Sequence, residues 1–275
     1  MILIIDLSYF IFHRFYASKA YVKISKQMDT LNCDFDDENF KNIYKNGMVK
    51  VIEKLTKKFR PNTIYLSKDC NRSEIWRNAI YGSYKNRKNL SDFDGRAFDI
   101  ALDEIIPRLQ LEYKKFKINR KTIDIPIEIV SYEQCEADDI SYVLCKKMFL
   151  DEEKIVISGD HDYMQLIDEK TEVMDLKLKS LREKSLGSAS IDLLFKILVG
   201  DKSDNIPQIC SKKQALELIQ KYSCDEINRL YECDSKFILN KKLIDMNEIP
   251  SHLVEEVMKL FDRDTRSQSE KKTSV

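Results

Sequence analysis

Five short apolar segments recur along the chain and constrain its fold more than any other feature of the sequence. They cover residues 2–6, 63–67, 126–130, 154–158 and 172–175. The first is a continuous apolar run, which is typical of a parallel strand buried on both faces. Segments with helical spacing of apolar residues lie between the strands, at residues 36–59, 97–116 and 136–149. This alternation predicts an α/β fold with a mostly parallel central sheet flanked by helices.

The pattern changes beyond residue 190, where short helical segments follow one another without strands. These segments cover residues 191–199, 212–222, 225–231 and 251–261. We therefore expect an α/β core over residues 1–190 and a helical C-terminal subdomain over residues 191–261. Residues 262–275 are charged and rich in small side chains, which predicts a disordered tail.

The composition excludes several classes of protein. Lysine and arginine total 46, equal to aspartate and glutamate, so attraction to a polyanion must come from local basic patches. The seven cysteines form no C-x-x-C pair and there are only three histidines, which argues against a disulfide framework or a structural zinc site. Because no long apolar run is present, we expect a cytoplasmic protein that does not contact a membrane.

Nine carboxylates stand at the ends of predicted strands or at the starts of predicted helices. They are Asp6, Asp69, Glu136, Asp138, Asp139, Asp160, Asp162, Asp201 and Asp204. The carboxyl ends of parallel strands meet at one edge of a sheet, where ligands usually bind. Unpaired carboxylates about 4 Å apart repel by roughly 4 kcal/mol per pair at an effective dielectric near 20. Oxygen ligands suit Mg²⁺ or Mn²⁺, and two such ions can direct water against a phosphodiester.

Each acidic motif also has a simpler explanation when it is taken alone. Acids in the first turn of a helix, as in residues 136–139, are favoured by the helix dipole. Residues 158–162 fit an Asx-rich turn, and residues 201–204 fit a helix-ending loop. Asp6 and Asp69 fit capping or turn roles. The coincidence of all these acids on one edge favours a two-metal site over the separate explanations.

Six motifs follow one another along the chain: IIDLS at residues 4–8, WR at 76–77, YKNR at 84–87, EADD at 136–139, SGDHD at 158–162 and KILVGDKSDN at 196–205. In this order they resemble the 5′-nuclease or flap endonuclease superfamily, which includes the nuclease domains of bacterial DNA polymerase I. The resemblance is closest to the ribonuclease H branch of T-even phages. It implies the PIN-like 5′-nuclease fold, with a helical arch that we expect at residues 86–121.

The resemblance also implies roles for individual residues. A first, catalytic metal would be held by Asp6, Asp69, Glu136, Asp138 and Asp160. A second would be held by Asp162, Asp201 and Asp204, with Asp139 acting through water or through either ion.

Lys85 and Arg77 match family residues that contact the scissile phosphate, and with Asp138 and Asp160 they would form the catalytic set. We expect Tyr81 and Tyr84 to stack on unpaired bases beside Arg87.

Duplex contacts are expected at the start of the helix over residues 212–222. Lys212 and Lys213 could reach phosphates without regard to sequence. Relatives that grip duplex DNA commonly place a Gly-x-Gly turn here, whose carbonyls bind a monovalent cation. Residues 207–214 contain no glycine, which argues against a potassium site.

The resemblance implies a structure-specific, divalent-metal-dependent 5′-3′ exonuclease or flap endonuclease with ribonuclease H activity. Its substrates would be DNA and RNA/DNA hybrid with a 5′ flap or 5′ end, and it would remove primers and flaps during DNA replication. A single-strand binding protein or a sliding clamp is an expected partner, and a phage-encoded enzyme would act in the host cytoplasm. Two alternatives are a PIN-type endoribonuclease, which usually has fewer carboxylates, and a non-catalytic replication factor, which usually lacks metal ligands.

Overall fold

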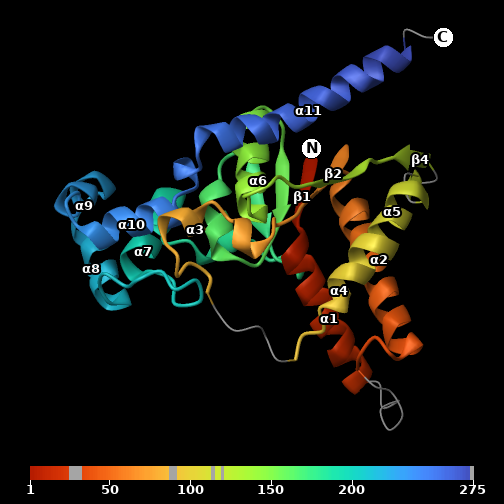
Figure 1. Ribbon diagram of the computed structural model, residues 1–275, viewed down its shortest axis with the longest axis horizontal. Coiled ribbons are helices and arrows are strands. Elements are labelled where there is room, and N and C mark those ends of the chain that lie inside the picture. The colour runs from red at the N-terminus through yellow and green to blue at the C-terminus, as the bar shows by residue number, and fades with distance from the viewer. Residues whose placement is uncertain (25–32, 87–91, 113–114, 119–120, 273–275) are drawn as a thin grey trace.

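The computed structural model describes residues 1–24, 33–86, 92–112, 115–118 and 121–272, and its central feature is a five-stranded parallel sheet (Figure 1). The strand order is β5-β2-β1-β6-β7. The strands are β1 Ile2–Asp6, β2 Thr63–Ser67, β5 Ile127–Val130, β6 Lys154–Ile157 and β7 Thr171–Met174. Each lies within one residue of the predicted segment, so the predicted α/β fold is confirmed. In the register of β1 with β2, Asp6 pairs with Ser67, which places these strand ends at the same edge.

Alternating side chains of β1 face two different cores, as the period of a strand requires. Leu3 and Ile5 enter a core with α1 Leu7–Ile24 and α2 Glu38–Phe59. Ile2 and Ile4 enter a second core, on the opposite face, with α6 Ala137–Val143 and the π-helical turn Leu144–Met148. Because both faces are buried, the strand is apolar throughout until Asp6.

Part of the expected arch belongs to the first core. This part contains α4 Arg96–Asp99, a π-helical stretch Ile100–Ile105 and α5 Ile106–Glu112. Ala97, Ala101, Ile105 and Leu109 are buried there with residues of α1 and α2. Residues 96–112 therefore form a wall of the core, and Phe98 and Leu102 of this stretch also line the cavity that contains Asp6 and Asp69. Residues 87–91 of the expected arch, with Arg87, lie outside the described residues.

A β-hairpin follows α5, where the sequence analysis expected helix up to residue 116. Its strands are β3 Lys115–Ile118 and β4 Lys121–Asp124, and they pair antiparallel as a separate two-stranded sheet. The sequence of β3 alternates lysine with apolar residues, which is a strand period and could have signalled the hairpin.

The C-terminal helices form a third layer beside the sheet. They are α7 Ala189–Val199, α8 Lys212–Lys221, α9 Cys224–Leu230 and α10 Ser235–Ile244, and they enclose a third cluster of buried apolar residues. The segment before residue 86 packs onto this layer through Ile75 and Tyr84. The layer therefore adjoins the loop that carries Lys85.

The last helix, α11 Ser251–Lys272, leaves this layer and returns to the sheet. Leu253 and Val257 are buried in the second core, where α11 packs against α6. α11 therefore packs on the α/β core. Residues 262–272, which the sequence predicted as a disordered tail, continue α11 away from the body (Figure 1). This stretch contains neither glycine nor proline to stop the helix.

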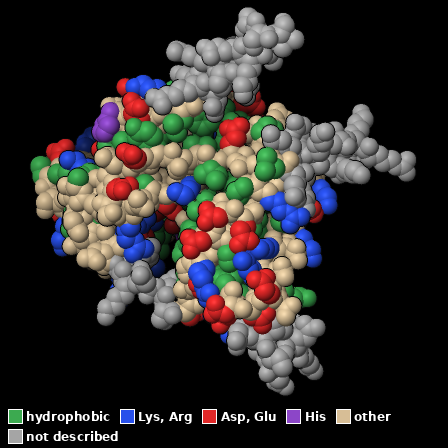
Figure 2. Space-filling view, turned by 45° about the vertical axis from the view of Figure 1, so that its right-hand side comes forward, with side chains coloured by type: hydrophobic (Ala, Val, Ile, Leu, Met, Phe, Trp, Pro, Cys, Tyr) green, Lys and Arg blue, Asp and Glu red, His purple; other side chains and the backbone are tan. Residues whose placement is uncertain are grey.

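The surface carries both signs of charge. Figure 2 shows acidic and basic side chains interspersed on one face, in keeping with the equal totals of 46 in the sequence. Among the described residues, no helix combines the length and apolar character needed to cross a bilayer.

Candidate metal centre

A cavity of about 640 Å³ opens at the carboxyl ends of β1, β2 and β6. Its walls contain all five residues expected to hold the first metal, which are Asp6, Asp69, Glu136, Asp138 and Asp160. Lys85 and Tyr163 also line it. Three strand ends and the N-terminus of α6 thus bring together acids that are up to 154 positions apart in the chain.

Asp6 and Asp69 are held by fixed donors at the bottom of this cavity. The Asp6 carboxylate accepts hydrogen bonds from the Ser158 hydroxyl (2.9 Å) and from the backbone N–H of Tyr9 (3.0 Å). Asp69 accepts from the Ala137 N–H (2.8 Å), which links the loop after β2 to the start of α6. Burial, and secondly the charge of Asp69, raise the pKa of Asp6 to about 7. A cation at this place would restore the ionised form.

The N-terminus of α6 supplies the next two acids of the cavity. Glu136 is the N-cap residue, and Asp138 lies in the first turn. Burial, followed by the charge of Asp139, raises the pKa of Asp138 well above its ordinary value. Burial acts in the same direction on Glu136, but the charges of Lys85 and Arg77 prevail and lower its pKa. The pKa values of Glu136 and Asp138 therefore shift in opposite directions, because of these two acids Glu136 is the one paired with cations.

Arg77 lies behind the acids and not in the cavity. Its side chain is 2% exposed, and its guanidinium donates to Asp139 (2.8 and 2.9 Å), to Glu136 (2.9 Å) and to the Leu243 carbonyl (2.8 Å). Arg77 was predicted to contact the scissile phosphate, and in this structure four of its five N–H donors are used inside the protein. A guanidinium at this buried position is stable because acidic partners compensate its charge.

Asp139 is the main partner of Arg77. Its carboxylate also accepts from the Trp76 indole N–H (3.0 Å) and from the Glu136 backbone N–H (3.0 Å), and the side chain is fully buried. One oxygen each from Glu136, Asp138 and Asp139 lies within 4.8 Å of the others. The hydrogen bonds of Asp139 nevertheless point to a positioning role, in which it orients the N-terminus of α6.

Asp162, Asp201 and Asp204 form a second acidic group, which we call the second group. One oxygen from each lies within 4.8 Å of the others. Burial, opposed by the charge of Lys196, raises the pKa of Asp162 to about 6. The Lys196 ammonium pairs with Asp162 and lies 3.2 Å from Asp201. Lys196 was not among the predicted site residues, although its place in the last turn of α7, before Asp201, was a signal that it lies near the acids.

The loop that carries Asp201 and Asp204 is tightly closed. Gly200 has φ +66, and a Cβ there would lie 2.5 Å from the Pro207 carbonyl, so only glycine fits. Asp201 and Ile206 exchange two backbone hydrogen bonds of 3.1 and 2.8 Å. The buried Asn240 amide of α10 donates to the carbonyls of Ile197 (2.8 Å) and Pro207 (2.7 Å), one on each side of the loop.

Lys85 lies between the two sets of acids. Its ammonium pairs with Glu136 and lies 3.7 Å from Asp204, while its backbone N–H donates to the Asp204 carbonyl (2.9 Å). The residue has φ 49, a left-handed conformation that the nearby Asn205 amide supports by donating to Ser83 and Asn86 carbonyls (both 2.9 Å). Unlike Arg77, Lys85 lines the cavity.

The two tyrosines predicted to stack on unpaired bases pack against other residues of the protein. Tyr84 is 5% exposed and its hydroxyl donates to Glu136 (3.0 Å). Tyr81 is half-buried and packs against the third cluster. Lys212 and Lys213 are exposed at the start of α8, as expected for duplex contacts, and Lys213 also lies 4.0 Å from Glu217.

The donor chemistry of both sites fits hard divalent ions. Among the described residues, the groups that could hold a metal consist only of carboxylates, with neither histidine nor cysteine. The carboxylates of the cavity and of the second group are bridged by Lys85. This arrangement could hold two cations side by side at the edge of the sheet.

Known proteins share this sequence pattern and fold. Residues 1–191 match the family described as 5′-3′ exonuclease, N-terminal resolvase-like domain. DNA polymerase I of Caldicellulosiruptor bescii is 31% identical over 185 residues, which are 53% of this chain and 21% of that protein. Ribonuclease H of Enterobacteria phage T4 is 37% identical over 102 residues, 34% of this chain and 33% of that protein. The 5′-3′ exonuclease of Bacillus subtilis (strain 168) is 25% identical over 207 residues, 68% of this chain and 61% of that protein.

The aligned regions span less than two thirds of each of these relatives. Among solved structures, bacteriophage T5 5′-exonuclease with bound divalent zinc ions superposes with a TM-score of 0.60 at 14% identity, covering 94% of this chain and 97% of that one. The T5 flap endonuclease in complex with DNA and metal ions gives the same TM-score of 0.60 at 14% identity, covering 94% and 96%. At this identity the likeness establishes the fold, and the family is established by the match over residues 1–191. The chain therefore belongs to the 5′-3′ exonuclease family, within the 5′-nuclease superfamily.

Proposed function

We propose that this protein is a divalent-metal-dependent nuclease that hydrolyses phosphodiesters at 5′ ends and 5′ flaps of DNA and of RNA/DNA hybrids. The observation that carries the proposal is the pair of carboxylate sets joined by Lys85 at one sheet edge. Mg²⁺ or Mn²⁺ bound by these oxygens would activate a water and neutralise charge on the phosphate. Removal of RNA primers during DNA replication is the role that this activity would serve.

Lys85 is the residue suited to contact the phosphate. Its side chain is 21% exposed and lines the cavity, so its ammonium can reach a substrate without unfolding the loop. A fixed cation at this place would stabilise the negative charge that develops on the phosphate oxygens. Asp6, Asp69, Glu136, Asp138 and Asp160 would hold the first cation, and Asp162, Asp201 and Asp204 the second.

A second cavity offers a place for duplex phosphates beside the acids. Its volume is about 860 Å³, and Asp160, His161, Lys202 and Lys212 are among the residues that line it. Lys212 and Lys213 would contact phosphates through charge alone, so replacing Lys212 by alanine should weaken binding equally for all sequences and reduce the salt slope by about one.

The test is cleavage of a labelled 5′-flap DNA and a labelled RNA/DNA hybrid with Mg²⁺, with Mn²⁺, and after addition of EDTA. Asp160→Asn should abolish cleavage and leave substrate binding in place. Asp151→Asn is the matched control, because Asp151 is a fully exposed aspartate at the opposite end of β6. Binding of both substrates without any metal-dependent cleavage would refute the proposal and favour a non-catalytic replication factor. Comparing rates on the two substrates measures the ribonuclease H activity.

A further inference from the structure

Lys196 lies among the carboxylates of the second group. Its ammonium forms an ion pair with Asp162 and lies 3.2 Å from an Asp201 oxygen. The Lys196 side chain is 17% exposed, and those of Asp162 and Asp201 are 18% and 21% exposed. A charged side chain so enclosed is held by its partners, because alone it would lose the hydration of its charge.

The acids of the first cavity lack such a partner. Among the residues that the structure describes, Asp6, Asp69, Asp138 and Asp160 form no ion pair within 4.0 Å. Glu136 is the exception, since it pairs with Lys85 and Arg77. The two sets of carboxylates therefore differ in how much of their negative charge is already balanced by basic side chains of the protein.

We propose, on the basis of the proposed function, that the Lys196 ammonium occupies the position of the second cation. A divalent ion then enters the second group only by displacing this ammonium. The affinity for the second ion is measured relative to the metal-free protein, in which Lys196 already forms two ion pairs with the second group. The second ion must break these pairs before it gains its own ligands. The second site consequently binds more weakly than the first, and Lys196 sets the difference.

The structure also offers space for the displaced ammonium. Lys196 borders the cavity of about 860 Å³, whose walls include Phe195, Lys202 and Lys212. The backbone of Lys196 stays in α7, whose neighbouring residues Ile197 and Leu198 are buried in the third cluster. Rotation of the side chain toward this cavity would free Asp162 and Asp201 without any movement of the helix.

The experiment is a titration of EDTA-stripped protein with Mn²⁺, in which electron paramagnetic resonance measures the free ion. In the wild type we expect one tight Mn²⁺ and a second whose Kd is at least about tenfold higher, a gap of about 1.4 kcal/mol. Lys196→Met should lower the Kd of the second ion by about tenfold or more. Lys196→Gln, which keeps a hydrogen-bond donor without the charge, should change it in the same direction.

Lys236→Met is the matched control. It removes the same charge from α10, where Lys236 is exposed, and Lys236 lines neither of the two cavities. Its Mn²⁺ titration should match the wild type. Thermal melting supplies a second readout, since Lys196→Met should melt lower in EDTA and gain more from Mn²⁺ than the wild type does.

The outcomes separate this inference from the function on which it rests. A second-site Kd that is unchanged or higher in folded Lys196→Met and Lys196→Gln would overturn the role of Lys196 while leaving the nuclease proposal intact. Wild-type protein that binds no Mn²⁺ at millimolar concentration would overturn the nuclease proposal itself. Neither readout depends on cleavage of a substrate.

Discussion

Replacing Arg77 by methionine tests whether this arginine stabilises the fold through its buried ion pairs or contacts substrate. Its guanidinium forms four hydrogen bonds shorter than 3.0 Å, three to the carboxylates of Asp139 and Glu136 and one to the Leu243 carbonyl. Methionine fills a similar volume but donates none of them. Both carboxylates would then remain buried, at 0% and 3% exposure, with less compensation for their charge.

Removing one partner of a buried ion pair costs about 3–5 kcal/mol of unfolding free energy. For a protein of this size each kcal/mol corresponds to roughly 2–4 °C, so Tm should fall by about 10 °C. The double variant Arg77→Met, Asp139→Leu removes both charges. Its loss of unfolding free energy should be smaller than the sum of the losses of the two single variants, by a coupling energy of about 1–3 kcal/mol.

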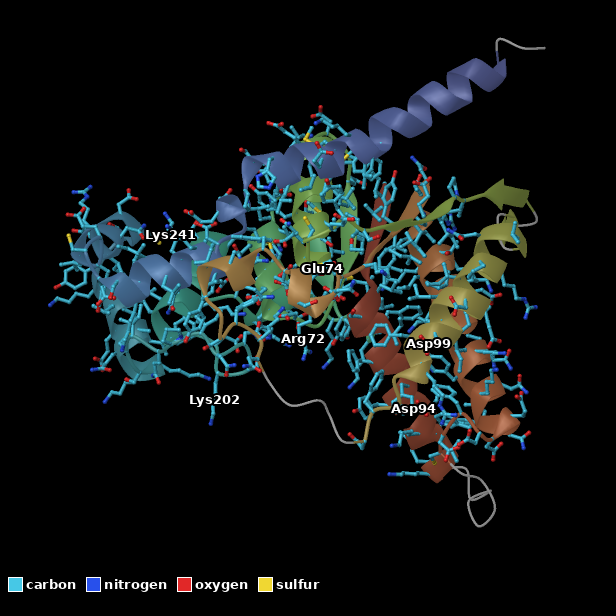
Figure 3. All side chains as sticks on the ribbon, viewed as in Figure 1. Arg72, Glu74, Asp94, Asp99, Lys202 and Lys241 are labelled. Atoms are coloured by element: carbon cyan, nitrogen blue, oxygen red, sulfur yellow. The ribbon has the colours of Figure 1, made fainter. Side chains whose placement is uncertain are left out.

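Urea denaturation in EDTA, followed by circular dichroism, measures these free energies independently of metal and substrate. Arg72→Met is the control, because Arg72 is an exposed arginine of the nearby turn at Arg72–Glu74 and should change stability by less than about 0.5 kcal/mol (Figure 3). If Arg77→Met were as stable as Arg72→Met and yet lost cleavage, the internal role would be refuted and a phosphate contact restored.

The structure predicts three further effects. The pKa of Asp6 is about 7 in the folded protein, against 3.8 for the free group, so the folded state binds this proton more tightly than the unfolded state. The contribution of Asp6 to the free energy of unfolding of the metal-free protein should therefore fall as pH rises from about 4 to 7. Metal needs the ionised carboxylate, so Mn²⁺ affinity should rise over the same interval and level off above it, as titrations at several pH values would show. Asn240→Leu should cost about 1–3 kcal/mol in urea denaturation, because the Ile197 and Pro207 carbonyls lose a buried donor. Lys85→Ala should lower kcat on the order of 100-fold with a much smaller change in KM, whereas an equal loss in binding would make Lys85 a simple phosphate anchor.

The sequence by itself determined the sheet and the location of the acids. Short apolar runs between helical segments leave few arrangements other than parallel strands covered on both faces. Once the strands are parallel, residues that follow them must gather at one edge, so Asp6, Asp69 and Asp160 were predictable as neighbours. Each of these inferences depends on local periodicity, which a chain displays before it folds.

Only the tertiary structure decided how the charged side chains are paired. Arg77 is buried because Asp139, 62 positions away, and Leu243, 166 positions away, supply its partners. Lys85 and Lys196 both pair with acids from other segments of the chain, 51 and 34 positions away. Whether a charge is exposed to substrate or used internally depends on which partners the packing brings within hydrogen-bond distance. That information is distributed over distant parts of the chain and has no local signature.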